Sequence, residues 1–348
     1  MEALRICLAC AKALDIETRP VWLMIIGPGS VGKSAFYLQA ASAYDPRVFS
    51  DEITIPGILS ASNHGFGEGV LKKLGKRGLW LISDFTVMLN SSEDKRNALL
   101  GAWRKIYDGH YERNADGRKA SWHGHIHVIL ACTNAIERFY RVHSDLGERF
   151  LQVRIEKQEF HPDLVKKVAN QAEHWEEFQN EIVAAAKRYL ANTPDDAKVP
   201  FEFECQIMHW ADFVSMGRTG TTRNYKDEIV GVSAEEGTAR AGQQLLGLVR
   251  ADAMLQGQLE VGELQMPLVR RVAMDCLPWA RRAILSIMPA DEKLSLPDLQ
   301  EISGIAHPYT FDRTIDELVA IGALKVEKSS LGPGKAWLSD RLNPLLRY

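Results

Sequence analysis

The residues best suited to chemistry in this sequence form one short glycine-rich segment near its start. Residues 27–34 read Gly-Pro-Gly-Ser-Val-Gly-Lys-Ser, the pattern G-x-x-x-x-G-K-[ST] of a phosphate loop. In such a loop the backbone N–H groups surround a polyphosphate, the lysine contacts the β- and γ-phosphates, and the last hydroxyl binds Mg²⁺. The sequence therefore predicts a site for ATP and Mg²⁺. Its predicted residues are Gly27, Pro28, Gly29, Ser30, Val31, Gly32, Lys33 and Ser34.

The residues around this loop favour a strand before it and a helix after it. An apolar run occupies residues 21–26, and residues 35–42 have the composition of a helix. A helix that begins at the loop directs its N-terminus, with its free backbone N–H groups, at the bound anion. We therefore expect the loop to connect a buried strand to a helix.

A second motif supplies an acidic residue at the end of another apolar run. Residues 78–83 read Gly-Leu-Trp-Leu-Ile-Ser, and Asp84 comes directly after them. A carboxylate at the end of a buried strand, in a chain that also has a phosphate loop, is suited to hold Mg²⁺. We expect Asp84 to share the metal with Ser34.

The glutamate that commonly polarises the attacking water is missing from this motif, because Phe85 follows Asp84. Two interpretations stay open. Either an acid from elsewhere activates the water, with Glu52, Glu93 and Asp108 as candidates, or turnover is slow and ATP binding is itself the signal.

Two further polar residues follow in an order that suits phosphate chemistry. Asn134 ends the next apolar run and is placed to orient water beside a γ-phosphate. Arg149 stands just before another strand-like run, where it would meet the nucleotide of a neighbouring subunit as an arginine finger. The sequence therefore indicates a nucleotide site shared between subunits.

This ordered series resembles the AAA+ ATPases, with the phosphate loop, Asp84, Asn134 and Arg149 in the places of Walker A, Walker B, sensor 1 and arginine finger. Thr238-Ala239-Arg240 is similar to the start of the sensor 2 helix of minichromosome-maintenance (MCM) helicases, which implies a sensor role for Arg240. Asp-Phe-Thr at residues 84–86 also looks like the motif of ATP-binding proteins of phages and integrative elements. The resemblance implies a homo-oligomeric ring, most simply a hexamer, that acts on DNA together with replication or element-encoded proteins.

A hairpin is expected between Asp84 and Asn134. Two β-prone runs flank an Asn-Ala-Asp-Gly turn within residues 107–122. In MCM-like and superfamily 3 helicases a hairpin at this place projects into the central pore. The resemblance therefore implies that Arg113, Arg118 and Lys119 grip DNA phosphates, and the alternative is a surface hairpin with solvated charges.

The pattern along the chain predicts three parts. Residues 1–160 alternate strand-like and helical segments, which indicates an α/β core of AAA+ type with a largely parallel sheet. Residues 161–275 are mainly helical and are expected to form a lid or connector that carries Arg240. Residues 276–348 predict a winged-helix domain, with a recognition helix at 309–321 and a wing at 329–334.

The winged helix is expected to present Arg313 and Lys335 to DNA, and a packing or protein-docking role stays open. The net charge of −3 argues neither for nor against DNA. No run of about 18 apolar residues or signal-like N-terminus occurs, so we expect no membrane span and a cytoplasmic location.

The cysteines and histidines do not indicate a further metal site. Cys7 and Cys10 lie in an Ala/Leu-rich helical stretch without a second pair at zinc-like spacing, so we expect them to be buried helix residues. Histidines cluster at 110, 123, 125 and 127, where alternating residues on an edge strand explain them better than a metal site. Mg²⁺ is therefore the metal that the sequence predicts.

The sequence as a whole favours a ring-forming, ATP-hydrolysing DNA motor or remodeller. One alternative is an ATP-switched loader or recruitment factor with slow turnover, indicated by the missing glutamate. Another is a regulator that senses ATP and acts through the winged helix.

Overall fold

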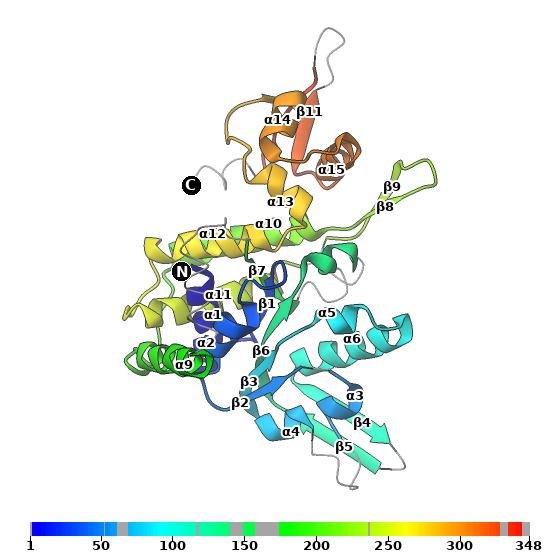
Figure 1. The fold of residues 1–348 in the computed structure, drawn as a ribbon. Helices are drawn as coiled ribbons and strands as arrows, with labels where there is room; N and C mark the ends of the chain where they lie inside the picture. Colours follow the sequence, from blue (N-terminus) through cyan, green and yellow to red (C-terminus); the bar gives the residue numbers. More distant parts are fainter. Residues whose placement is uncertain are drawn as a thin grey trace. The chain divides into compact units, whose positions relative to one another are not determined.

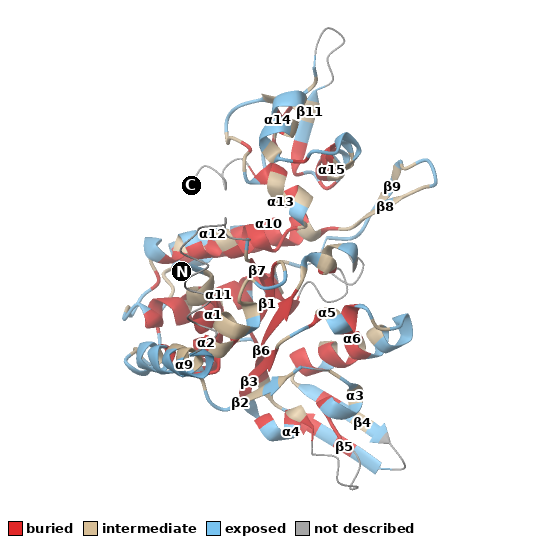
Figure 2. Ribbon diagram, in the orientation of Figure 1, coloured by how far each residue is buried: buried red, intermediate tan, exposed pale blue. Residues whose placement is uncertain are grey.

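A five-stranded parallel sheet forms the centre of the N-terminal part of the chain, and its strand order is β2-β3-β6-β1-β7. Its three central strands are almost wholly buried apolar runs, which is typical of a parallel sheet covered on both faces (Figure 2). The expected mixed α/β fold with a parallel sheet is confirmed. The strands are β1 (Trp22–Ile26), β2 (Arg47–Ser50), β3 (Arg77–Ile82), β6 (His125–Cys132) and β7 (Leu151–Arg154).

The computed structural model describes residues 2–51, 53–60, 69–115, 118–139, 149–156, 174–235, 237–327 and 333–342 (Figure 1). The chain divides into two compact units. The first comprises Met1–Phe203 and Gln243–Leu268, and the second comprises Glu204–Gly242 and Val269–Tyr348. The three-part division at residues 160 and 275 stays a prediction.

Helices and a hairpin complete the first unit. Helix α6 (Glu93–Tyr107) has Glu93 and Asp94 in its first turn and Arg104 and Lys105 in its last, which complements the helix dipole. The other elements are α1 (Glu2–Lys12), α2 (Gln39–Ala41), α3 (Ile55–Ile58), α4 (Val70–Leu74), α5 (Thr86–Leu89), β4 (His110–Ala115), β5 (Arg118–His123) and α9 (Trp175–Ala191), with the short helices η1 (Ala13–Asp15), η2 (Lys33–Leu38) and η3 (Asn134–Phe139). The π-helix η2 begins at the last two residues of the phosphate loop and continues into α2, so the expected helix after the loop is present. Cys7 and Cys10 are fully buried in α1, as expected.

Aromatic side chains fill the space between the sheet and α6. The ring of Trp103 in α6 stacks on Trp80 of β3, with centroids 5.2 Å apart and an interplanar angle of 18°. Trp22 of β1 meets Trp103 edge-on at 5.1 Å and 88°. Because all three side chains are at most 1% exposed, this cluster fixes α6 over the strands that precede the phosphate loop and Asp84.

The second unit contains helices, a hairpin and a small antiparallel sheet. Its sheet has the order β10-β12-β11, formed by β10 (Leu294–Ser295), β11 (Leu324–Glu327) and β12 (Lys335–Leu338). The hairpin consists of β8 (Thr221–Arg223) and β9 (Ile229–Val232). The helices are α13 (Trp279–Leu285), α14 (Leu296–Ser303) and α15 (Pro308–Ala320), while α10 (Phe201–Arg218), α11 (Ala239–Leu255) and α12 (Met266–Asp275) are shared between the units.

Local signals explain where α14 begins and ends. The Ser295 hydroxyl accepts the Asp298 N–H, Pro297 occupies the first turn, and Gly304 ends the helix with φ of 69°. The buried guanidinium of Arg281 then ties α13 to the end of α10 through the carbonyls of Gly217 and Thr219, at 2.9 and 2.8 Å. Among the described residues, none of the helices is both long enough and apolar enough to cross a membrane.

Candidate functional site

The phosphate loop begins where β1 leaves the sheet. The Gly27 N–H donates to the Cys132 carbonyl of β6 at 3.2 Å, and a Cβ on Gly27 would lie 2.7 Å from the Ile155 carbonyl oxygen. Ser30 and Gly32 have left-handed φ values of 61° and 79°, on either side of an ordinary Val31. Such alternation turns successive backbone N–H groups toward one concave side, where an anion can bind.

Lys33 lies over the loop that it follows. Its ammonium donates to the carbonyl oxygens of Gly27, at 2.8 Å, and Pro28. Partial burial lowers the pKa of Lys33, and the negative charge of Asp84 opposes that shift. The lysine therefore lies at the mouth of the loop, within the field of the predicted metal-binding acid.

Ser34 joins the loop to the end of β3. Its hydroxyl donates to the Ser83 carbonyl at 3.0 Å, and Asp84 follows Ser83 directly. The Asp84 carboxylate is exposed and accepts the Thr86 N–H at 2.8 Å. The structure thus brings together the residues that the sequence separates by 50 positions.

These residues line one cavity of about 400 Å³ at the edge of the sheet where the strands end. Binding at the carboxyl ends of parallel strands is the general rule for open α/β sheets. Its lining residues are Gly29, Ser30, Gly32, Lys33, Ser34, Ala35, Ser83, Asp84, Ala131, Cys132 and Thr133. Burial raises the pKa of the Cys132 thiol to about 12, so this sulfur is neutral at pH 7.

A pair of threonines connects the ends of β3 and β6. The Thr86 hydroxyl donates to the Thr133 hydroxyl at 3.2 Å and accepts the Thr133 N–H at 3.2 Å. Thr86 also donates its backbone N–H to Asp84, so it touches both strand ends. Asn134 is exposed beside Thr133 and does not line the cavity, and its sensor role stays a prediction.

The side chain after Asp84 faces the core. Phe85 is fully buried, with its ring edge-on to Trp103 at 5.9 Å and 72°. A glutamate here would not reach the cavity in this backbone conformation. The position is therefore a packing position in this chain.

Asp51, which the sequence alone did not single out, lies at the end of the neighbouring strand β2. Its carboxylate accepts a hydrogen bond from the Ser83 hydroxyl. The preceding Ser50 is held by the Trp80 indole N–H, which donates to its hydroxyl at 2.9 Å. Asp51 does not itself line the cavity, but it stands one strand away from Asp84 and is bonded to Ser83, which does line it and whose carbonyl accepts from Ser34.

The three acids named from the sequence are placed less favourably. Asp108 follows α6 next to Gly109, whose carbonyl accepts the Gly124 N–H just before β6 begins. Because β6 spans eight residues, roughly 23 Å of strand separates that end from the cavity. Glu93 opens α6 and does not line the cavity, and Glu52 falls outside the described residues.

The two candidate arginines are not among the residues that line the cavity. Arg149 is 9% exposed, with its guanidinium carbon 5.8 Å from the ring centroid of the buried Tyr107. That contact is made within the same subunit. The role of Arg149 as an arginine finger stays a prediction. Arg240 lies at the start of α11, in the second unit, and is half-buried, so its sensor role also stays a prediction.

The expected hairpin is present as β4 and β5, paired from His110 with His123 to Ala115 with Arg118. Arg113 donates to the Leu59 carbonyl at 3.2 Å, whereas Lys119 pairs with Glu112 at 2.9 Å and Arg118 is exposed. The contact of these side chains with DNA phosphates stays a prediction.

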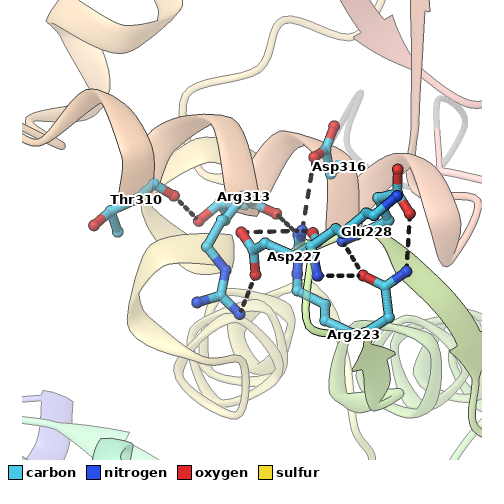
Figure 3. A network of polar contacts seen from close by, with 9 residues as sticks. Arg223, Asp227, Glu228, Thr310, Arg313 and Asp316 are labelled. Carbon is cyan, nitrogen blue, oxygen red and sulfur yellow. Dashed lines mark hydrogen bonds and ion pairs between the residues drawn. The ribbon is translucent and has the colours of Figure 1, made fainter.

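In the second unit, Arg313 of α15 meets the turn of the β8–β9 hairpin (Figure 3). Its guanidinium lies 3.6 Å from the Asp227 carboxylate and 5.5 Å from the Tyr309 ring. The buried Arg223 donates to the Arg313 carbonyl at 3.0 Å and lies 3.8 Å from Asp316. Lys335 is exposed on β12, opposite Glu327 and Ser295.

Within the described part of the chain, no group of three or more His, Cys, Asp or Glu side chains is arranged to hold a metal ion. No protein-family model matches the chain, and no curated protein sequence matches it. A functional proposal therefore depends on the geometry around the phosphate loop.

Proposed function

We propose that the chain is an ATPase of AAA+ type, which hydrolyses ATP at subunit interfaces of a ring and uses the energy to move along or remodel DNA. One observation carries the ATPase part. Ser34 of the loop bonds to the end of β3 at 3.0 Å, and Lys33, Ser34 and Asp84 line the same cavity. This is the set of groups that phosphoryl transfer requires: a phosphate cradle, a cation beside it and a metal-binding carboxylate.

The residues present fit ATP and Mg²⁺. The alternating φ values at Ser30 and Gly32 form an anion-binding curve, and Lys33 supplies a positive charge at its mouth. Ser34 and Asp84 offer hard oxygen ligands of the kind that Mg²⁺ prefers. When bound, Mg²⁺-ATP supplies the phosphoanhydride bond and a cation that neutralises its phosphates. The chain orients that group and receives a proton from the attacking water.

Asp51 is the residue that we assign to that last step. A carboxylate that acts as general base must lie within one water molecule of the γ-phosphate. Strand β2, which ends beside Asp51, is the neighbour of β3, which ends beside Asp84. Ser83 holds the Asp51 carboxylate in place. This arrangement offsets the missing glutamate, because the base comes from the neighbouring strand.

The DNA part of the proposal rests on the β4–β5 hairpin. Its strands expose Arg118 and Lys119 near the turn. The Lys119–Glu112 pair is solvent-exposed, and such pairs are weak, so Lys119 can exchange its partner for a phosphate. Arg113 is bonded to the Leu59 carbonyl, which is a neutral partner.

Residues 276–348 are proposed to form a winged-helix domain, and residues 161–275, which include α9, α10 and α11, a helical lid or connector. The order of α13, α14, α15 and the β10-β12-β11 sheet supports this. Helix α15 carries Asp312, Asp316 and Glu317 against a single basic residue, Arg313, which pairs with Asp227. That charge balance favours a packing or protein-docking role for α15 over contact with DNA phosphates.

A slow ATP-switched loader is the second candidate, favoured by Phe85 in the core. Turnover with saturating forked DNA separates the two. A motor should hydrolyse ATP quickly with DNA stimulation, whereas a loader should retain ATP with little phosphate release.

The decisive experiment measures phosphate release per subunit against protein concentration, with and without forked DNA. The expected rate per subunit rises with concentration as interfaces assemble, and Lys33→Ala abolishes it. Mixing Lys33→Ala with Arg149→Ala subunits should restore part of the activity. Where the two variants meet in the right order, the interface has Lys33 from one subunit and Arg149 from the other. A constant rate per subunit, with monomeric sedimentation in ATP and DNA, would contradict the ring.

A further inference from the structure

A second cavity of about 400 Å³ lies at the opposite edge of the parallel sheet, where the strands begin. Arg77 and His125 are register partners at the first residues of β3 and β6, and both line it. The segment between α1 and β1 forms the other wall. The lining residues are Ile16, Glu17, Thr18, Arg19, Arg77 and His125.

The charges in this cavity are mainly positive. Arg19 and Arg77 both line it, against the single acid Glu17. In the described part of the chain neither arginine forms an ion pair with a carboxylate, and Arg77 is held by donating to the Ile16 carbonyl at 2.8 Å. A guanidinium fixed by one carbonyl keeps other N–H groups for an anion, and its fork matches the oxygens of a phosphate.

A chain of hydrogen bonds fixes the protons of the histidine pair behind these arginines. His127 is fully buried, with Nδ1 at 2.9 Å from the Cys10 carbonyl and Nε2 at 3.2 Å from His125 Nε2. A carbonyl only accepts, so His127 carries its proton on Nδ1 and accepts the Nε2–H of His125. Nδ1 of His125 is therefore the nitrogen that can take up a proton.

The pair is neutral without a ligand. Burial, with the charges of Arg77 and Arg19, lowers the pKa of His125 to about 4, and burial lowers the pKa of His127 to about 3. The charged or titratable groups near His125 include Arg19, Arg77, Glu17 and His127, together with Lys76, whose carbonyl accepts the His125 N–H, and Cys10, which bonds to His127. An anion beside the arginines would oppose their repulsion and favour a proton on His125.

We propose that this cavity is a second anion site, in which Arg19 and Arg77 bind a phosphate group and His125 faces it. The site lies at the root of the β4–β5 hairpin, since β5 ends at His123 and β6 begins at His125. The phosphate can belong to a free polyphosphate or to a DNA backbone passing the hairpin. The second source rests on the proposed function, and the first does not.

The test uses the full chain with Lys33→Ala, so that the phosphate loop contributes no binding. Sodium pyrophosphate is titrated while the Cε1–H resonance of ¹³C-labelled His125 is followed against pH. The pKa of His125 should rise on binding, and affinity should increase as the pH falls through the raised value. His174, which pairs with Glu177 and does not line the cavity, is the internal reference.

Arg19→Gln and Arg77→Gln should each weaken pyrophosphate binding by about tenfold or more. Lys95→Gln, an exposed charge in α6, should not change it. Both arginines are exposed, so neither substitution removes a buried side chain. Arg19→Gln also removes no described hydrogen bond, so it tests the site even if Arg77→Gln, which loses the bond to Ile16, fails to fold. An unmoved His125 pKa together with unchanged affinity in Arg19→Gln would overturn the site.

A second arm replaces pyrophosphate with single-stranded DNA. If DNA also raises the His125 pKa and competes with pyrophosphate, the phosphate comes from the backbone. If only pyrophosphate acts, the site takes a free anion. A chain without ATPase activity would fail the proposed function and leave the pyrophosphate arm intact.

Discussion

Ser34 and Asp51 never touch, yet both bond to Ser83, the first through its carbonyl oxygen at 3.0 Å and the second through its hydroxyl. One residue at the end of β3 therefore sets the spacing between the phosphate loop and a carboxylate on β2. Asp84 follows Ser83 and lines the same cavity as Ser34. Two acids from adjacent strands are thus positioned by one serine.

Replacing Asp51 tests whether it is the base. Asp51→Asn should lower kcat by about 10²-fold or more and leave the KM for ATP nearly unchanged, because the amide keeps the Ser83 bond but takes no proton. Steady-state phosphate release measures both constants. Glu93→Gln is the matched control and should behave as the parent. Equal losses in the two variants, or none in Asp51→Asn, would remove Asp51 from the mechanism.

Placing a glutamate after Asp84 should not improve the enzyme. Phe85→Glu puts a carboxylate among Trp103 and its neighbours, so we expect a loss of about 3–5 kcal/mol in the free energy of unfolding and no faster turnover. Urea unfolding measures the first quantity. Phe85→Leu should cost only about 1–1.5 kcal/mol. A stable Phe85→Glu protein with raised turnover would show that this position reaches the cavity.

ATP affinity should fall as the pH rises through the lowered pKa of Lys33. Burial depresses that pKa, so the ammonium that attracts the phosphates is lost at a lower pH than for an exposed lysine. Lys33→Arg stays charged and should lose this pH dependence even if it binds more weakly. Equilibrium binding of a fluorescent ATP analogue at several pH values measures both. Identical pH profiles for the two proteins would exclude Lys33 as the titrating group.

The hairpin and α15 should differ in their effect on DNA binding. Arg118→Ala and Lys119→Ala should each weaken binding and reduce the slope of log affinity against log salt by about one unit. Arg313 already pairs with Asp227, so Arg313→Ala should change neither the affinity for DNA nor the salt slope. Fluorescence anisotropy at several salt concentrations gives the slopes. The reverse pattern would place the DNA on α15.

The sequence predicted the parts of the sheet that are uniformly buried. Strands β1 and β3 are apolar runs and were found within two residues of their ends, and the run before Asn134 corresponds to β6. Strand β2 has the pattern Arg-Val-Phe-Ser, is half exposed and has no such signal. Missing β2 also meant missing Asp51, since its importance comes from a bond to a residue 32 positions away. A polar pair after a short strand was its sole local trace.

Side-chain environments were harder to predict than elements. The Asp-Gly turn indicated the β4–β5 hairpin correctly, because turn chemistry is local. Nothing near Arg149 in the chain reveals that Tyr107 lies beneath it, and nothing near Arg313 reveals Asp227. Both contacts depend on how distant segments pack.

The stacked rings of Trp80 and Trp103 have an optical consequence. Two indoles held 5.2 Å apart, with Trp22 at 5.1 Å from the second, couple their electronic transitions, so the near-ultraviolet absorption of this cluster depends on how its rings are placed. Trp80 also bonds to Ser50 beside Asp51, so a shift of the β2 end would alter its surroundings. The protein thus contains its own chromophore pair beside the strand end that carries Asp51, and the light it absorbs reports on this region without a label.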